Sequence, residues 1–391
     1  MLFRPARTSD LDEICMLLAT SRQPPEQVHA MLVADPAFDP SLIRLAWTGG
    51  RIVACARIYR RTLRIGTAGV LAGGVGNLRT DARRWRQGLA SSLLGECLVA
   101  MFLEGMVLSP LFSARHTLFA RRGWHVMPEP VVEIPPQALI AAAGASKEPI
   151  RVRPFESQDL DAVAALHESA NAGRTGTVVR DQGLWRERLT VLDLQGATAF
   201  VATCDGEVVG FAWAQPRKGT AEVLELLLAP WAEEAWIPLL TAVATHHKAE
   251  TLRATLPADY LQRVYAVLGD HALVSMRDDL MLRIVDPTQL LVALSPLLAA
   301  RLRDIGPVAP LALRIGPLRG GAVLRLAGTD LTVERPRRDD PLLVSEEAFL
   351  SLLLGAPDTA THLEALPEAA RAALSCLFPP QDWVYWRSDA F

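Results

Sequence analysis

Paired cysteines, long apolar runs and a strong net charge are all missing from this chain of 391 residues. The five cysteines are scattered singly without C-x-x-C spacing, which indicates neither a zinc site nor a disulfide framework, so we expect no metal. A formal charge of -3 gives no overall attraction to nucleic acid or to an anionic membrane, and we expect neither partner. The N-terminus lacks an apolar signal core, and the apolar run from Leu290 to Ala300 is interrupted by Pro296. We therefore expect a cytoplasmic protein.

The chain is too long for a single hydrophobic core, because cores seldom grow beyond about 250 to 300 residues before a chain divides. Half of its residues are hydrophobic and 21% are charged, which is a globular composition. Two or three domains are expected.

An internal repeat divides the first two thirds of the chain. Arg4-Pro5 followed by Asp10-Leu11-Asp12 recurs as Arg153-Pro154 followed by Asp159-Leu160-Asp161, at the same spacing. In both copies an apolar helical pattern and then a predicted hairpin follow, at residues 42–58 and 199–214. One supersecondary unit therefore occurs twice.

The repeat and the composition predict three domains, at residues 1–147, 148–283 and 284–391. Residues 141–149 (AAAGASKEP) have the small, polar composition of a linker between the copies. After Asp286-Pro287 the pattern changes to a helix over 288–303, followed by short strands near 311–315, 322–326 and 331–333. The expected fold class is α/β, with an α+β domain at the end.

The stretch from Asn77 to Leu94 carries the clearest chemical signal. A strand over residues 71–80 leads through a loop containing Gly88 into a helix with an apolar stripe over residues 89–102. A helix N-terminus offers unpaired N–H groups and partial positive charge, and a glycine lets a diphosphate approach the backbone. The alternative is that Gly88 only shapes an ordinary strand-to-helix turn.

The run NLRTDARRWRQGLASSLL resembles motif A of the GNAT superfamily of N-acetyltransferases, whose core is Arg/Gln-x-x-Gly-x-Gly/Ala. Gly88 and Ala90 match the motif, whereas Trp85 stands at its Arg/Gln position. The resemblance implies that acetyl-CoA is the cosubstrate. It implies contacts from the strand edge and the loop, which we assign to Leu78, Arg79, Thr80, Arg84, Arg86, Gln87, Gly88, Ala90 and Ser91.

A second segment, LSPLFSARHTLFARRGW (residues 108–124), resembles the part of the same family that ends in Tyr-x-x-x-Gly-Phe/Trp. In the family this tyrosine protonates the departing CoA thiolate, but Phe119 occupies its position here. A positioned acid contributes about 10²- to 10⁴-fold in rate. His116, one helical turn earlier, is the candidate substitute acid, and a structural histidine is the alternative.

The second copy lacks these features. The strand at residues 223–228 is followed by a helix start with Glu233 and Glu234 and with no glycine. Because two glutamates satisfy the helix dipole and repel phosphate, we expect this copy not to hold CoA.

The order of one intact copy, one degenerate copy and a C-terminal domain resembles the enhanced intracellular survival (Eis) type of acetyltransferase. Residues 344–379 are similar to a sterol carrier protein fold, the third domain of that group. The resemblance implies two tandem GNAT folds with mixed central sheets and a closed homo-oligomer. It also implies that the free C-terminal carboxylate, here that of Phe391, enters the first active site as a base, for which a frayed terminus is the alternative.

These observations predict an N-acetyltransferase in which a small-molecule amine attacks acetyl-CoA directly. The Eis resemblance implies an aminoglycoside-like or other polyamine acceptor. A catalytically weak acyl-CoA or small-molecule binding protein is the alternative, motivated by Phe119 and Trp85. Lipid carriage by the last domain is a third hypothesis.

Overall fold

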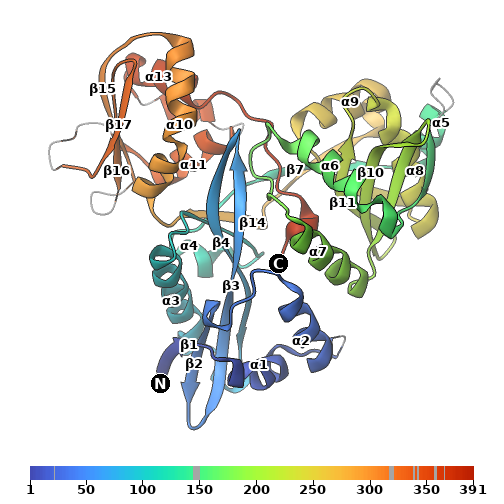
Figure 1. Cartoon of the computed structure of the whole chain (residues 1–391), viewed down its shortest axis with the longest axis horizontal. Helices are drawn as coiled ribbons and strands as arrows, with labels where there is room; N and C mark the ends of the chain where they lie inside the picture. The colour runs from blue at the N-terminus through green and yellow to red at the C-terminus, as the bar shows by residue number, and fades with distance from the viewer. Residues whose placement is uncertain are drawn as a thin grey trace. The chain divides into compact units, whose positions relative to one another are not determined.

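The computed structural model describes residues 1–21, 23–143, 150–316, 321–337, 340, 343–355, 359–364 and 366–391. The chain divides into two compact units, each with its own large sheet (Figure 1). The first unit contains Met1–Met127, Asp278–Gln381 and Phe391, and the second contains Pro128–Arg277 and Asp382–Ala390.

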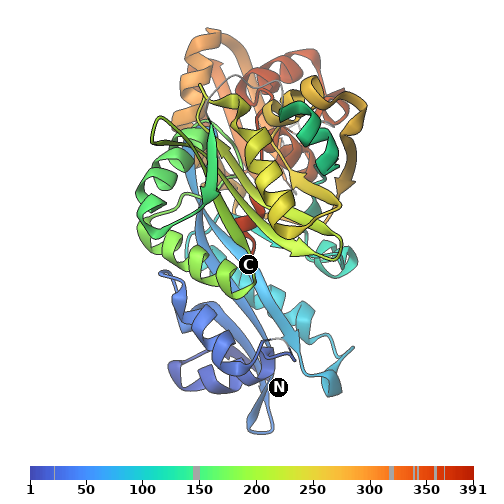
Figure 2. The same ribbon diagram turned by 90° about the vertical axis from the view of Figure 1, so that its right-hand side faces the viewer.

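Seven strands form a mixed sheet in the first unit, in the order β1-β2-β3-β4-β5-β14-β6. Their bounds are Leu2–Pro5 (β1), Ile43–Thr48 (β2), Arg51–Ile65 (β3), Ala68–Thr80 (β4), Leu108–Phe112 (β5), Leu280–Ile284 (β14) and His125–Val126 (β6). Neighbouring strands run antiparallel, except for the parallel pair of β4 and β5. The long ribbon of β3 and β4 is prominent in Figure 2.

Helices cover both faces of this sheet. The helices here are α1 (Leu11–Leu18), α2 (Pro25–Ala34), α3 (Leu89–Leu103) and α4 (His116–Ala120). Along β3, Cys55 joins the core with α1 and α2, whereas Ala54 and Ile58 join the core with α3. Because side chains alternate along a strand, Arg57 and Tyr59 lie on the face toward α1 and α2.

The second unit contains another mixed sheet of seven strands, in the order β13-β7-β12-β11-β10-β9-β8. Its strands are β7 (Glu129–Ile134), β8 (Arg151–Pro154), β9 (Thr198–Cys204), β10 (Glu207–Arg217), β11 (Thr220–Leu228), β12 (Thr251–Thr255) and β13 (Leu273–Arg277). Its helices are α5 (Pro136–Ala143), α6 (Leu160–Asn171), α7 (Gln182–Leu194), α8 (Trp236–His247) and α9 (Ala258–Leu268). Only β11 and β12 pair in parallel among these strands.

The two sheets repeat one local design, as the sequence predicts. Arg4 donates two hydrogen bonds to Asp10, of 2.7 and 2.8 Å, and Arg153 donates two to Asp159, of 2.6 and 2.7 Å. In each copy the carboxylate also accepts the backbone N–H three residues before it. The same pair thus fixes the turn between the first strand and the first helix in both copies.

Strand pairing does not follow the predicted domain boundaries at residues 147 and 283. β7 falls in the expected first domain, yet it pairs with β12 and β13 of the second sheet. β14 falls in the expected second domain, yet it lies between β5 and β6 of the first sheet. The predicted linker begins inside α5, and its residues 144–149 lie outside the described part. Each copy therefore completes its sheet with a strand that lies beyond the predicted boundary.

The rest of the first unit is α+β, as predicted. A small sheet has the order β17-β16-β15-β18, with β15 (Val308–Ile315), β16 (Ala322–Gly328), β17 (Asp330–Glu334) and β18 (Leu343–Val344). Its helices are α10 (Pro287–Ile305), α11 (Glu346–Leu354), α12 (Thr359–Glu364) and α13 (Glu368–Leu377). The hydroxyl of Ser345 accepts the N–H of Ala348, so that it caps α11.

The described residues contain neither a membrane-spanning helix nor a metal-binding cluster. None of the helices there is both long and apolar enough to cross a bilayer. No group of three or more His, Cys, Asp or Glu side chains in the same residues is arranged to hold a metal ion.

Candidate active site

A bulge interrupts β4 beside its predicted cofactor-binding end. Gly76 pairs with Arg57 and Arg79 pairs with Cys55, so β4 has one residue more than β3 between these pairs. Asn77 at this point has a φ of 51°, and its side-chain amide donates to the Tyr59 hydroxyl at 3.1 Å. Such bulges bend a strand and redirect its side chains and backbone groups.

The edge of β4 that faces β5 is only partly paired. Within the described residues, the ladder between these parallel strands is confined to Ala72 and Leu108. The hydroxyl of Ser109 donates to the Gly73 carbonyl at 2.8 Å. Leu78, Arg79 and Thr80 follow on β4, beyond the residues that pair with β5. A backbone edge of this kind is able to receive an extended ligand.

Gly88 provides an open helix N-terminus, as predicted. It is the N-cap of α3 with a φ of 76°, a conformation that favours glycine. No side chain caps this helix end, and no acidic residue lies in the first turn. A Cβ at Gly88 would have no atom within 4 Å, so the approach to the N–H groups of the first turn, which includes Ala90 and Ser91, is clear.

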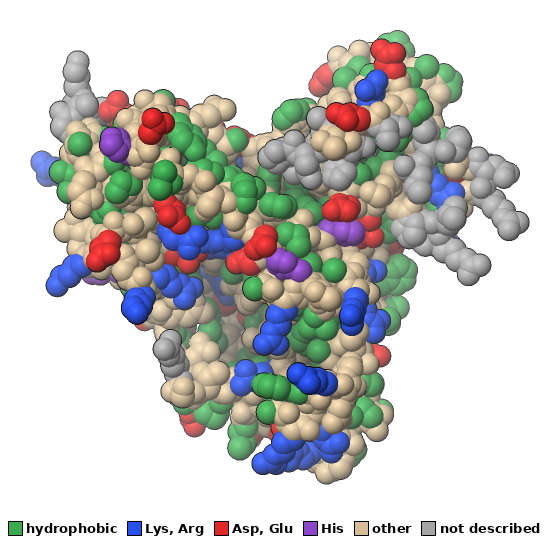
Figure 3. All heavy atoms as spheres, turned by 180° about the vertical axis from the view of Figure 1, so that it is seen from behind, with side chains coloured by type: hydrophobic (Ala, Val, Ile, Leu, Met, Phe, Trp, Pro, Cys, Tyr) green, Lys and Arg blue, Asp and Glu red, His purple; other side chains and the backbone are tan. Residues whose placement is uncertain are grey.

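Arginines surround this helix end. Arg83 and Arg84 close a short 3-10 helix (Ala82–Arg84) that residues 85–88 connect to α3, and Arg86 has a left-handed backbone. Arg122 reaches the first turn, where its Nε donates to the Ser91 hydroxyl at 2.9 Å. Positive charge at a helix N-terminus is unfavourable by about 0.3–1 kcal/mol per charge, and a bound anion reverses the sign. Figure 3 shows Lys and Arg side chains predominating on the lower part of its visible face.

Trp85, which departs from the family motif, lies largely in solvent. It is 66% exposed, and its indole N–H donates to the Thr80 carbonyl at 3.0 Å. The indole therefore binds the last residue of β4 and supports the loop.

The C-terminal residue lies on the α1 and α2 face of β4. The Phe391 ring stacks on Tyr59 with 4.9 Å between centroids, and it meets Phe112 edge-on at 6.1 Å. Side chains at Gly74 or Gly76 would collide with or crowd Phe391, and its carboxyl carbon lies beside Gly76. Within the described residues, no ion pair to this carboxylate is found. The terminus is thus packed next to the bulge rather than frayed.

The buried carboxylate of Asp35, on the same face, forms ion pairs with two arginines. Asp35 accepts hydrogen bonds from Arg57 at 2.7 Å and from Arg61 at 3.1 Å, and Arg57 also lies 4.1 Å from the centre of the Tyr59 ring. Burial raises the pKa of Asp35, but the charge and hydrogen bond of Arg61 and the charge of Arg57 outweigh it, so the pKa lies below its usual value. This carboxylate is therefore fully engaged within the fold.

The two remaining predicted catalytic residues, His116 and Phe119, lie on α4. Phe119 is 7% exposed and packs edge-on against Trp124 in the core under α3. His116 Nε2 lies 4.0 Å from the Asp278 carboxylate and has no hydrogen-bond partner in the described part of the chain. Within the described residues, no hydrogen bond or ion pair joins His116 to Tyr59, Asn77 or Phe391.

The corresponding region of the second repeat has acidic residues instead. Glu233 and Glu234 lie in a 3-10 helix (Glu233–Ala235) that leads into α8. On β11 the carboxylate of Glu225 is fully buried and contacts Arg180 at 2.9 Å.

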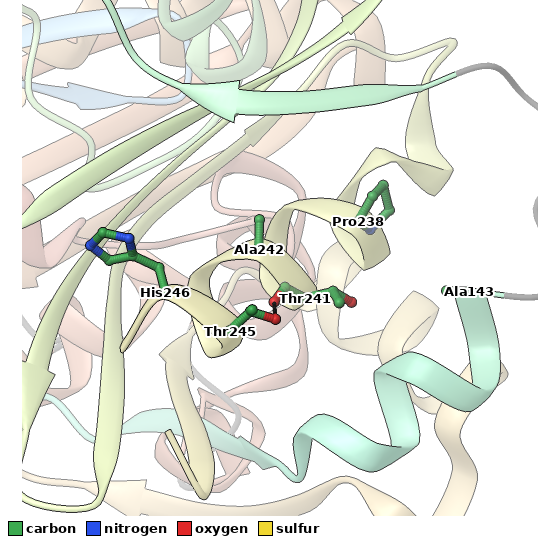
Figure 4. A pocket seen from close by; sticks show the side chains of 6 residues that line it. All are labelled: Ala143, Pro238, Thr241, Ala242, Thr245 and His246. Carbon is green, nitrogen blue, oxygen red and sulfur yellow. Dashed lines mark hydrogen bonds between the residues drawn. The ribbon is translucent and has the colours of Figure 1, made fainter. Parts of the chain in front are cut away.

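A separate cavity of about 510 Å³ lies between α5 and α8 (Figure 4) and contains none of the predicted site residues. Its lining residues are Ala143, Pro238, Thr241, Ala242, Thr245 and His246.

Comparison with known proteins identifies the first repeat. The family model described as an acetyltransferase (GNAT) domain matches residues 3–127. The first repeat therefore matches the GNAT acetyltransferase domain. No curated protein matches the sequence.

Solved structures share the fold of the whole chain beyond this GNAT domain. A GCN5-related N-acetyltransferase from Anabaena variabilis has a TM-score of 0.74 and 15% identity over 100% of both chains. One from Kribbella flavida gives 0.71 and 18%, over 100% of this chain and 98% of that one. Eis1 from Mycobacterium abscessus gives 0.69 and 18%, over 100% of both. The predicted architecture of two tandem GNAT folds followed by an α+β domain is confirmed.

Proposed function

We propose that the chain is an acetyl-CoA-dependent N-acetyltransferase that acts on an amine of a small molecule. The observation that carries the proposal is the open N-terminus of α3, where a left-handed glycine and several arginines meet without any acid in the first turn. The pyrophosphate of acetyl-CoA supplies the charge that this helix end lacks.

The cosubstrate contacts we propose follow from this position. The N–H groups around Gln87, Gly88, Ala90 and Ser91 receive the pyrophosphate, and Arg84 and Arg86 add charge-assisted bonds. The backbone of Leu78, Arg79 and Thr80 receives the extended pantetheine arm along the edge of β4. Arg122 joins this set, because it already contacts Ser91.

Transfer proceeds by direct attack of the neutral amine on the thioester carbonyl. A C–N bond forms as the C–S bond breaks, the CoA thiolate leaves, and the amine proton passes to the Phe391 carboxylate, directly or through water. Holding the two reactants together supplies much of the rate. The thiolate needs little help, since an ordinary thiol has a pKa of about 8.5.

His116 is the weaker part of the proposal, as the acid that returns a proton to the thiolate. Its free Nε2 has the chemistry for that role, but its nearest charged neighbour is Asp278. Phe119 has no proton to donate and contributes to the core instead.

The resemblance to the Eis group suggests that the acceptor is an aminoglycoside-like compound or another polyamine, and these are the amines to test. A homo-oligomer is expected on the same ground, and a cytoplasmic location is expected from the scattered single cysteines and the absence of an apolar signal core. The third domain is expected to be a structural module like a sterol carrier protein.

Phe119 and Trp85 favour a second candidate, a catalytically weak acyl-CoA binding protein. Thermal shift with acetyl-CoA, followed by measurement of free thiol with an amine panel, separates the two. Cosubstrate at 100 times its dissociation constant stabilises the folded chain by about 2.7 kcal/mol. Without a shift, both proposals fail. A shift without thiol release from any amine selects the binding protein.

A further inference from the structure

The last residues of the chain join the second unit through their backbone. Thr175 donates its N–H to the Asp382 carbonyl at 3.3 Å, and Val384 donates its N–H to the Thr175 carbonyl at 3.0 Å. A side chain at Gly176 would press against the Val384 carbonyl. Backbone pairing of an extended segment is a common mode of peptide recognition. We call residues Asp382–Ala390 the tail.

Apolar side chains of the tail are enclosed by the second unit. Val384, Tyr385 and Trp386 are each at most 2% exposed, and Val384 and Trp386 belong to the hydrophobic core of this unit. The indole N–H of Trp386 donates to the Asn171 side-chain oxygen at 3.0 Å. The tail is thus bound as a fixed ligand would be, with the indole N–H of Trp386 satisfied.

Charged groups fix the register of the tail. Arg180 donates from Nε to Asp389 at 2.9 Å and from Nη2 to Glu225 at 2.9 Å, while the Ser388 hydroxyl donates to Glu225 at 2.5 Å. Arg188 donates to the carbonyls of Ser388 and Ala390 at 3.2 and 3.0 Å. Slipping the tail by one residue would leave these buried charges without partners, which costs far more than losing an exposed pair.

The position of this network corresponds to the active-site face of the first repeat. β11 carries a register shift opposite Trp213 and Ala214, as β4 carries one opposite Cys55 and Arg57. Glu225 lies beside the shift and approaches His167 of α6 at 3.6 Å. Since α6 and α7 follow β8 as α1 and α2 follow β1, the tail occupies the face of β11 that corresponds to the face of β4 under Phe391.

We propose that the degenerate second repeat is a peptide-binding site whose ligand is the C-terminal tail of its own chain. In place of CoA and an amine, this copy binds residues 382–390 through a backbone bridge, a buried indole and the Arg180 network. Phe391 follows Ala390 directly, so the binding of the tail also limits how far the terminal carboxylate moves. This assignment does not require the chain to be an enzyme.

Carboxypeptidase digestion of the full-length chain tests whether the second repeat binds the tail. The released Phe391 and Ala390 are followed by mass spectrometry. Asp389→Asn and Arg180→Met each remove part of the buried network, and we expect release on the order of 100-fold faster, because digestion follows local opening of the tail. Arg217→Gln is the matched control, since Arg217 is an exposed partner of Glu222 in the same unit. The control is expected to match the parent chain.

Release at the parent rate in both network variants overturns the proposal, as does equal acceleration by Arg217→Gln. Hydrogen exchange keeps the test decisive if Arg180→Met loosens the whole unit. In Asp389→Asn the amides of residues 383–389 must lose protection while those of β9 and β10 keep it. Loss of protection throughout the sheet would show that the network supports the fold rather than binding the tail. Neither readout uses acetyl-CoA, so failure of the proposed function leaves this test intact.

Discussion

The two repeats share a turn, a sheet and a pair of helices, yet the pKa values of the buried carboxylates on the corresponding face are shifted in opposite directions. In the first, Asp35 lies between two arginines, and the pKa of its carboxyl is below its usual value. In the second, burial and the nearby charge of Asp389 outweigh Arg180, so that the pKa of Glu225 is raised. On the first face the Phe391 carboxylate has no ion-pair partner among the described residues, whereas the second face is filled by the tail.

The charge at the start of the helix that follows the bulged strand also differs between the two repeats. In the first repeat it begins with Gly88 and is surrounded by arginines, and in the second the corresponding helix follows Glu233 and Glu234. The residues at the first helix end would favour a bound anion, and those at the second would disfavour one. Four measurements test this difference between the repeats.

The largest expected effect follows from moving the Phe391 carboxylate. Extending the chain by two glycines keeps the ring and displaces the charge, and we expect kcat to fall by about 10²- to 10⁴-fold because the base is lost. Phe391→Leu keeps the carboxylate and should retain most of the rate. Steady-state kinetics with the best amine compares the two. An unchanged kcat in the extended chain would remove the terminus from the mechanism.

Asp35→Asn is expected to destabilise the first repeat by about 3–5 kcal/mol at neutral pH, because Arg57 and Arg61 stay buried without their shared anion. A group whose folded pKa is lowered stabilises above its unfolded pKa, and the stabilisation is lost as the pH falls through the folded pKa. The gap between parent and variant should therefore shrink below pH 3.8, the ordinary value for this carboxyl. Denaturant unfolding across pH measures it, and a gap that grows with acid would contradict the assignment.

Gly88→Glu should weaken acetyl-CoA binding by roughly 100-fold, because it adds negative charge at the proposed pyrophosphate site. Gly88→Lys carries the same backbone strain with the opposite charge, and so it separates the electrostatic effect from the conformational one. Calorimetric titration gives both affinities. Equal losses in the two variants would mean that backbone strain, not charge, accounts for the effect.

The smallest effect tests what the repeats have in common. Asp10→Asn and Asp159→Asn each weaken a two-bond pair with arginine, and we expect similar local losses of about 1 kcal/mol. Hydrogen exchange of the first helix in each repeat reports them separately. A large loss in only one copy would show that the matching pairs support the two folds differently.

Local signals in the sequence predicted the parts of the site that depend on neighbouring residues. Gly88 was predictable because a helix start that needs a positive φ selects glycine, and the Arg4 and Asp10 spacing identified the repeat. For Arg122 the sequence leaves a solvated surface position and a phosphate contact both open, and its bond to Ser91, 31 residues away in sequence, was not predictable. Phe102 was placed on the apolar stripe of α3 but is 57% exposed.

The exchange of β7 and β14 was not predictable from the sequence for a related reason. Hydrophobic alternation predicts a strand but does not identify its partner, and each of these strands pairs with residues more than 100 positions away. The predicted boundaries followed composition, whereas the sheets are completed by whichever strand satisfies their open edges.

The place of β14 also sets the order in which the protein can fold on the ribosome. β6 ends at Val126, but the strand that must fit between it and β5 begins at Leu280. Translation at about 5–20 residues per second leaves roughly 8–30 s during which the nascent first sheet has an unfilled position. Unpaired strand edges are prone to non-native association, so this interval is when a chaperone or slow synthesis would influence the yield most.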